Sequence, residues 1–291
     1  MRRIKSIQGA PESFTTWLND NSTTLNERYS TQTGNILWSF FKNKYREFYH
    51  ELKMRLIEDQ GFICCYCGRQ IENEWHTSIE HVKPKGKEEY IKLIFDFDNL
   101  LASCNGSSDY KIHVVQKEDE TLESIAGTYK VNIEYLIDVY VNIDELQLFR
   151  TKYNIENLSI GDRIVIIPKI VNAIHCDIKK GNTEIEITPN QDNCQDFFRY
   201  DALTGKIIVT PKNSNTIKDL GLNNNRYIDQ LRKRSFEFGI NLQEQLVSEF
   251  GELPEELIEQ RDNIISKINT VNRLGDKLEP FSFVIVDSLL Q

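Results

Sequence analysis

The stretch Cys64-Cys65-Tyr66-Cys67-Gly68 decides the fold of this chain, because it carries two thiols at the spacing of a zinc knuckle. A Cys-x-x-Cys turn with a glycine directly behind it is the usual way to place two thiolates on one Zn²⁺. Cys65 and Cys67 could instead form the ligand pair, but a Cys-x-Cys spacing is less common. One knuckle supplies two of the four ligands of a tetrahedral site, so two more must come from elsewhere in the chain.

Cys104 and Cys176 are the best candidates for the second pair of ligands. They are 72 positions apart, but setting aside residues 112–169, which are 58 residues, leaves a gap of about 14. That gap is ordinary for a second ligand pair. His175 could replace Cys176 as the fourth ligand. The sequence therefore predicts a structural zinc on Cys64, Cys67, Cys104 and Cys176, with Cys65 and Cys194 as ordinary buried thiols.

Composition limits the classes of protein to which the chain can belong. Its 291 residues are 40% hydrophobic, enough for one large domain or two modest ones. The net charge of −9 means that any contact with nucleic acid must use a local basic patch. Met1–Lys5 is basic, but polar residues follow, and no apolar run has the length of a membrane span. We expect a cytoplasmic protein with no membrane partner, whose clustered thiols bind metal.

Apolar periodicity predicts the elements around these motifs. Residues 36–59 carry apolar side chains at helical spacing, which predicts one helix ended by Gly61. Residues 112–169 read as a strand, a helix from Thr121, a second helix at 132–139 and a strand at 163–167. The C-terminal part reads as strands at 183–187 and 206–210, helices at 217–249 and 254–272, and a last strand at 281–286.

Glu80-His81 is the pair of residues that suggests catalysis. A histidine directly after a carboxylate, at a strand end near a zinc knuckle, can take a proton from water as neutral imidazole. A hard cation on carboxylate oxygens can carry a phosphate. Lysines flank this pair and the second half of the site, which favours phosphate contact over a merely solvated face. The predicted phosphate-binding residues are Lys83, Lys85, Lys179 and Lys180, with Lys87 nearby.

These motifs together resemble the HNH endonucleases. The matching residues are Cys64-x-x-Cys67, Glu80-His81, Asn99, Cys104, and Cys176-Asp177-x-x-Lys180-Gly181-Asn182. The resemblance implies an α+β fold whose ββα core is supported by zinc and carries a helical scaffold. It also implies that Glu80 and Asp177 bind Mg²⁺ or Mn²⁺, that His81 is the general base and that Asn99 is the orienting residue. Many relatives have His or Asn at the position of Asp177, and a carboxylate there should still bind a hard cation.

Further motifs narrow the resemblance to the PtuB-type HNH proteins of bacterial Septu anti-phage systems and some retrons. They are Met1-Arg2-Arg3-Ile4-Lys5, Ile79-Glu80-His81-Val82-Lys83-Pro84-Lys85, Asn99-Leu100-Leu101-Ala102-Ser103-Cys104-Asn105-Gly106 and Leu220-Gly221-Leu222-Asn223. The likeness covers nearly the whole chain except 112–169. It implies DNA as the substrate and a PtuA-like ABC/SMC-type ATPase as the partner.

Residues 112–169 resemble a LysM domain, because they close on Gly161-Asp162-Arg163-Ile164-Val165-Ile166-Ile167-Pro168 and contain Asp119-Glu120-Thr121-Leu122. Glu120 is one residue more than the usual start. We therefore expect a discontinuous HNH domain, 1–111 and 170–291, with a βααβ insertion in an exposed loop rich in turn residues. LysM domains bind N-acetylglucosamine polymers, but here a protein-binding role is favoured. The alternative for the whole chain is a non-catalytic zinc-containing subunit that docks an ATPase or a glycan.

Overall fold

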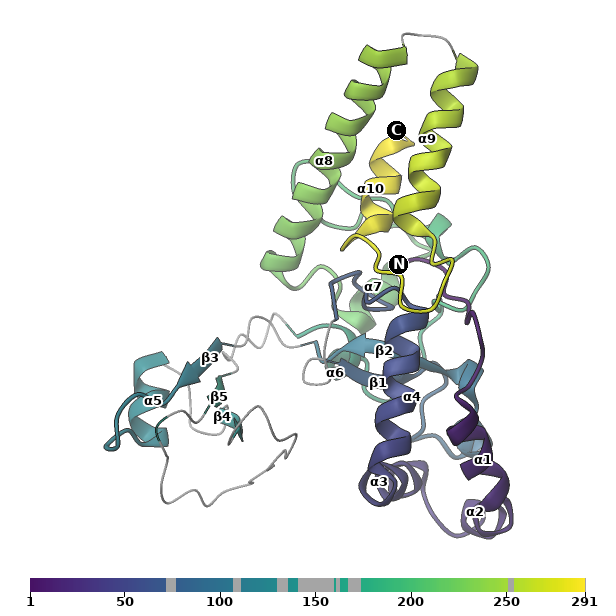
Figure 1. Ribbon diagram of the computed structural model, residues 1–291, viewed down its shortest axis with the longest axis vertical. Coiled ribbons are helices and arrows are strands. Elements are labelled where there is room, and N and C mark those ends of the chain that lie inside the picture. Colours follow the sequence, from purple (N-terminus) through teal and green to yellow (C-terminus); the bar gives the residue numbers. More distant parts are fainter. Residues whose placement is uncertain are drawn as a thin grey trace. The chain divides into compact units, whose positions relative to one another are not determined.

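The computed structural model describes residues 1–71, 77–106, 111–129, 136–140, 160, 163–166, 174–250 and 254–290. The chain divides into two compact units, of which the larger joins Met1–Gly106 to His175–Gln291 and the smaller is Ser107–Ile174. The larger unit is mostly helical with a small antiparallel sheet of two strands (Figure 1). The predicted insertion at 112–169 lies inside the range of the smaller unit.

The larger unit begins with four helices. They are α1 (Glu12–Asp20), α2 (Ser22–Tyr29), α3 (Gly34–Lys44) and α4 (Arg46–Asp59). The single helix predicted at 36–59 is wrong, because the chain breaks at Tyr45, whose φ of −119° and ψ of 56° are not helical. The break turns the chain between α3 and α4, and the Trp38 ring on α3 lies 5.9 Å from the Tyr49 ring on α4. Periodicity continues through the break, so it could not reveal the change of direction.

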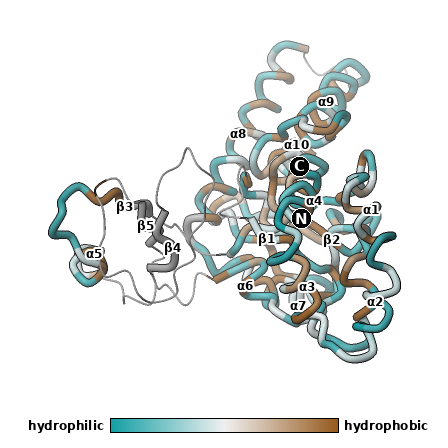
Figure 2. The backbone as a smooth tube through the Cα atoms, turned by 60° about the horizontal axis from the view of Figure 1, so that its bottom comes forward, coloured by the Kyte–Doolittle hydropathy of each residue, from teal (hydrophilic) through white to brown (hydrophobic). Residues whose placement is uncertain are grey.

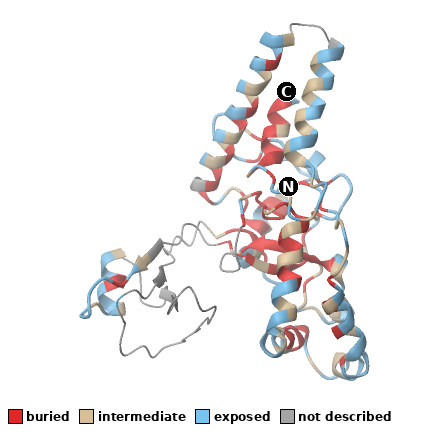
Figure 3. Cartoon of the chain, viewed as in Figure 1, coloured by how far each residue is buried: buried red, intermediate tan, exposed pale blue. Residues whose placement is uncertain are grey.

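The sheet lies in the core of this unit. Strand β1 (Thr77–His81) pairs antiparallel with β2 (Leu100–Cys104), so that Thr77 faces Cys104 and His81 faces Leu100. The fully buried Gln60, just past α4, attaches that helix to β2: its amide donates to the Ala102 carbonyl at 2.7 Å and accepts from the Ala102 N–H at 2.7 Å. Buried residues gather in β1, β2 and the inner side of α4 (Figure 3).

The C-terminal part is a helical scaffold. Its helices are α6 (Cys176–Lys180), α7 (Ser214–Leu220), α8 (Arg226–Phe250), α9 (Pro254–Asn269) and α10 (Ser282–Leu289). Helix α10 packs against both α8 and α9, and its residues are among the more hydrophobic ones of this region (Figure 2).

Two predictions for this region are wrong. The last strand predicted at 281–286 is part of α10, because a short apolar run buried on all sides fits a helix as well as a strand. Residues 183–187 and 206–210 are not in strands, and only an isolated bridge pairs Tyr200 with Ile207.

The smaller unit contains a three-stranded antiparallel sheet and one described helix. Its elements are β3 (Lys111–Val114), α5 (Leu122–Tyr129), β4 (Leu136–Tyr140) and β5 (Arg163–Ile166), with β5 between β3 and β4. The second helix predicted at 132–139 is wrong over 136–139, which lie in β4; its first part lies outside the described residues. Ile137, Val139 and Tyr140 belong to the β-branched and aromatic types that fit a pleated sheet, and pairing with β5 decides the outcome.

Within the described part of the chain, no helix combines the length and the apolar character that crossing a bilayer requires.

Candidate metal centre and active site

The four predicted cysteine ligands come together in one buried cluster. The sulfur atoms of Cys64, Cys67, Cys104 and Cys176 all lie within 4.8 Å of one another. The first two come from the turn after α4, the third from the end of β2 and the fourth from the start of α6. The alternative ligand His175 is buried beside this set, with its Nε2 3.7 Å from the Cys104 sulfur. Cys176 therefore completes the four-sulfur group.

The spacing of the sulfurs fits a tetrahedral zinc ion. Cys67 Sγ and Cys104 Sγ are 3.7 Å apart, and Cys64 Sγ and Cys176 Sγ are 3.9 Å apart. Four sulfurs at the usual zinc–sulfur distance would be separated by about 3.8 Å. A disulfide needs about 2.05 Å, and all six cysteines of the chain are free. The cluster can therefore hold a structural zinc.

The electrostatics of the cluster also call for a cation. Burial raises the pKa of the Cys176 thiol well above its usual value. Burial also opposes ionisation of Cys64, but hydrogen bonds from Cys104 and Cys176 outweigh it and hold the Cys64 pKa well below the usual range. The backbone N–H of Cys104 donates to Cys64 Sγ at 3.2 Å, a contact that favours a thiolate. Four thiolates can share this dry space only if a cation neutralises them.

Two residues at the cluster, Gly68 and Cys176, have positive φ angles. Gly68, behind the knuckle, has a φ of +78°, and a Cβ there would lie 2.3 Å from the Phe283 ring. Cys176 has a positive φ of 51°, unusual for a residue with a side chain. Such strain persists only where the surroundings impose it. We attribute it to the need to bring the fourth sulfur back to the other three.

A hydrogen bond closes the chain where the smaller unit interrupts the larger one. The His175 N–H donates to the Gly106 carbonyl at 3.1 Å. Gly106 has a φ of +70°, and a Cβ there would overlap the His175 carbonyl. The two segments that carry the ligands are thus joined directly, although 68 residues of sequence separate Gly106 from His175.

Glu80 and Asp177 bring two carboxyl groups together beside the cluster. Burial raises the pKa of Glu80 to about 8, against the pull of Lys180, and the hydrogen-bonded Asp177 carboxyl adds to the rise. Lys180 is only 1% exposed, and its Nζ lies 2.7 Å from Glu80 Oε1 and 2.9 Å from the His81 carbonyl oxygen. Lys180 was predicted to bind phosphate, but here it is the buried partner of Glu80.

His81 has its two ring nitrogens in different environments. Nε2 lies 3.1 Å from the Ile94 carbonyl, which can only accept, so Nε2 carries the hydrogen and Nδ1 has the lone pair. Nδ1 is buried and makes no hydrogen bond to the described residues. Burial and then the charge of Lys85 lower the pKa of His81 to about 3, so the ring is neutral. The ring is packed edge to face on Trp38, 4.5 Å away, and the residue is 2% exposed.

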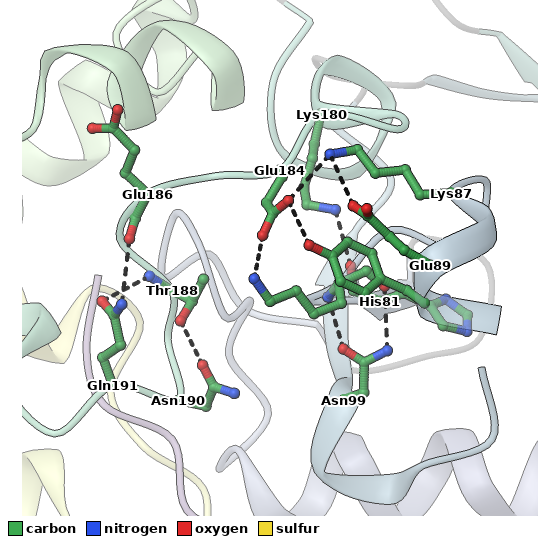
Figure 4. A network of polar contacts seen from close by, with 12 residues as sticks. His81, Lys87, Glu89, Asn99, Lys180, Glu184, Glu186, Thr188, Asn190 and Gln191 are labelled. Atoms are coloured by element: carbon green, nitrogen blue, oxygen red, sulfur yellow. Dashed lines mark hydrogen bonds and ion pairs between the residues drawn. The ribbon is translucent and has the colours of Figure 1, made fainter. Parts of the chain in front are cut away.

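Asn99 holds the chain after His81. Its Oδ1 accepts from the Lys83 N–H at 2.7 Å, and its Nδ2 donates to the carbonyls of Lys83 at 3.2 Å and Leu93 at 2.9 Å. The side chain predicted to orient the catalytic group therefore fixes the backbone of the segment from Lys83 to Leu93 (Figure 4).

The lysines predicted to bind phosphate have different partners. Lys83 forms an ion pair with Glu184, a residue that the sequence analysis did not single out. Lys85 is partly buried near His81, and Lys179 is exposed. Glu184 also contacts Lys87 and Tyr90, as Figure 4 shows for Lys87. No sequence signal marks Glu184, because it lies about a hundred positions from the lysines that it contacts.

Neither a scan against models of known protein families nor a search of curated proteins finds a match for this chain, so the argument for its function rests on this geometry.

Proposed function

We propose that the chain is a metal-dependent HNH-type DNA endonuclease and the effector subunit of an ATPase-coupled anti-phage defence system. The arrangement of His81 carries this proposal. Its Nε2 is fixed by the Ile94 carbonyl, its Nδ1 lone pair is unpaired among the described residues, and the preceding residue, Glu80, belongs to the Glu80–Asp177 carboxyl pair. A fixed neutral imidazole beside a pair of carboxyl groups is suited to removing a proton from water.

The order of the elements supports the same proposal. Strands β1 and β2 pair, and α6, which carries Asp177 and Lys180, packs on β2. This order fits the ββα core that the HNH resemblance implies, with the smaller unit inserted between β2 and α6. The four-cysteine cluster would hold the two halves of this core together through its zinc.

The residues of the site divide the work of phosphodiester hydrolysis between them. Glu80 and Asp177 would hold Mg²⁺ or Mn²⁺, which in such sites stabilises the leaving 3′ oxygen. His81 Nδ1 would take the proton of the water that attacks the phosphorus in line with that oxygen. Lys85 and Lys179 would contact the DNA backbone. The negative phosphate would raise the pKa of His81 from its low value and so increase its strength as a base.

The observed state is closed. His81 is almost inaccessible, and Lys180 occupies the Glu80 carboxylate on which a metal ion would bind. Activity therefore requires an opening step, which DNA or the ATPase partner would drive. The same closure favours a second candidate function, a non-catalytic zinc-containing subunit that docks its partner.

Plasmid nicking separates the two candidates. The purified full chain with Mn²⁺ would be measured alone and with a partner ATPase of the expected type. We expect His81→Ala to lower nicking by at least about 100-fold, because general-base catalysis contributes that much. His50→Ala, which changes an exposed histidine on α4, should cut like wild type. Zinc analysis must show all three proteins equally loaded. Equal nicking by wild type and His81→Ala would refute the assignment of the base, and no nicking by any protein would favour the docking subunit.

A further inference from the structure

Lys83, Lys87 and Tyr90 form a cradle of three donors around one carboxylate, which we call the lysine–tyrosine cradle. Lys83 Nζ contacts Glu184 Oε1, while Lys87 Nζ and the Tyr90 hydroxyl lie 3.1 and 2.9 Å from Glu184 Oε2. The two ammonium groups also lie over the Tyr90 ring, 5.2 and 5.8 Å from its centre. The Lys87 ammonium group also forms an ion pair with Glu89 at 3.9 Å.

The cradle is fixed relative to His81. Lys83 follows His81 by two residues, and its backbone N–H and carbonyl are both bound by the Asn99 side chain. The Tyr90 N–H donates to the Lys87 carbonyl at 3.1 Å, so these two donors belong to one turn. The positions of the donors are therefore set by the segment that Asn99 holds and not by Glu184, which lies on a separate segment after α6.

The chemistry of the cradle matches a phosphodiester. A phosphodiester presents two unesterified oxygens that share one negative charge, and a carboxylate presents the same. Two ammonium groups and a neutral hydroxyl can donate to either anion. Bound Glu184 raises the pKa of the Tyr90 hydroxyl to about 12, so the hydroxyl keeps its hydrogen and remains a donor.

Glu184 is placed where it can be exchanged. The Glu184 side chain is 29% exposed, and those of Lys83 and Lys87 are 42% and 39% exposed. Ion pairs with this much solvent contact are weak and are screened by salt. A chain of phosphates can therefore compete with a single carboxylate for the two lysines.

We propose that the lysine–tyrosine cradle binds a DNA backbone phosphate next to the one that is cut, and that Glu184 occupies it as an internal phosphate mimic in the free protein. This inference rests on the proposed nuclease function. A DNA phosphate must displace Glu184 to enter the cradle, so Glu184 lowers DNA affinity and disfavours weak, non-specific binding.

The test compares Glu184→Gln with Glu186→Gln in the full chain. Glu186 lies two residues away and is exposed, and its carboxylate accepts a hydrogen bond from the Asn215 side chain. Its variant therefore makes the same change of net charge outside the cradle. Binding of a fluorescent DNA duplex would be followed by anisotropy without added divalent ions. We expect Glu184→Gln to bind about tenfold more tightly than Glu186→Gln at low salt, with the gain shrinking as salt rises. Adding Lys83→Met to Glu184→Gln should remove most of the gain.

Inorganic phosphate provides a second probe that does not depend on nuclease activity. Its binding would be followed by NMR shifts of the Lys87 and Tyr90 amides, and we expect it to be stronger in Glu184→Gln than in Glu186→Gln. Equal affinities of the two variants for both DNA and phosphate would overturn the proposal, even if wild type cuts DNA and His81→Ala does not. A gain for phosphate but not for DNA would refute a DNA subsite. A gain for both with no cutting by any protein would uphold the cradle and refute the nuclease.

Discussion

The zinc cluster and the Glu80–His81 site are built from the same segments but are in different states. Cys176 and Asp177 are neighbours in the chain, and Cys104 and His81 lie at opposite ends of the paired strands. The cluster has four ligands of one kind at the spacing that its ion needs. The candidate active site has its charged groups paired with each other, with Lys180 on Glu80 and Glu184 on Lys83.

The two sites differ in whether the protein itself can neutralise their charges. Four thiolates in one buried space repel one another, so a metal ion is needed to complete the cluster. The carboxylates and lysines of the other site have opposite charges, and they can satisfy one another until a substrate or metal ion competes. The first site would therefore stabilise the fold, and the second can be switched by displacement of internal partners.

Removing a ligand of the zinc cluster should have the largest effect. We expect Cys64→Ser to lose the zinc and the cooperative unfolding of the larger unit, because structural zinc sites contribute on the order of 10 kcal/mol to folding. Cys65→Ser is the matched control, since Cys65 is the neighbouring buried thiol outside the cluster. It should keep its zinc. Metal analysis and thermal unfolding measure both outcomes, and full zinc content in Cys64→Ser would break the contrast between the two sites.

Lys180→Met should have a moderate effect that a metal ion reverses. The Glu80 carboxyl would lose its buried partner. Because Lys180 lowers the Glu80 pKa, which burial raises to about 8, removing Lys180 should raise it further and leave the carboxyl protonated at neutral pH. We therefore expect a loss of about 1–3 kcal/mol of unfolding free energy in urea without Mn²⁺. Mn²⁺ should stabilise this variant more than wild type, since Lys180 no longer competes for Glu80. Lys179→Met, on the exposed neighbour, should stay within about 0.5 kcal/mol of wild type. No difference in Mn²⁺ response between Lys180→Met and wild type would count against the carboxyl pair as a metal site.

The pairing of Glu184 should have a smaller effect that depends on pH. Hydrogen bonds from Lys83, Tyr90 and Lys87 lower the pKa of Glu184 to about 2. Its ionised form therefore favours the folded state above the unfolded-chain pKa of about 4.3. That contribution falls away as the pH drops through about 2. By carbon NMR the Glu184 carboxyl should not titrate between about pH 6 and 4.

Lys83→Met should move the Glu184 titration upward, toward the ordinary glutamate value, because the partner that lowers its pKa most is gone. Lys179→Met should leave it unchanged. A wild-type Glu184 that titrates near the ordinary glutamate value would show that the cradle is open in solution.

Replacing Ser107–Ile174 with a short glycine linker should have the smallest effect. The ends of the larger unit are already joined by the His175–Gly106 hydrogen bond, so we expect the zinc content to be retained and the unfolding free energy to change by less than about 1 kcal/mol. The four-cysteine cluster and the Glu80–His81 site should both keep their structure. Loss of zinc or aggregation would show that the smaller unit is needed to complete the cluster.

The four-cysteine cluster and the interruption between its members could be predicted from the sequence. Thiol spacing fixes which ligands a short turn can bring to one ion, so Cys64 and Cys67 were identifiable, and the remaining cysteines followed from the gap. The sequence also indicated most of the helices, although a short apolar run such as 281–286 fits a strand as well as a buried helix, and only packing against α8 and α9 decided it.

Which charged side chains pair with each other depends on the tertiary fold. Nothing in the sequence distinguishes the buried Lys180 from the exposed Lys179, or marks Glu184 as the partner of Lys83 and Lys87. Charge pairing depends on distance in space and on access to water, and both are set only when segments far apart in the chain pack together. Glu80 and His81 could therefore be singled out from the sequence, whereas the ion pairs that surround them could not.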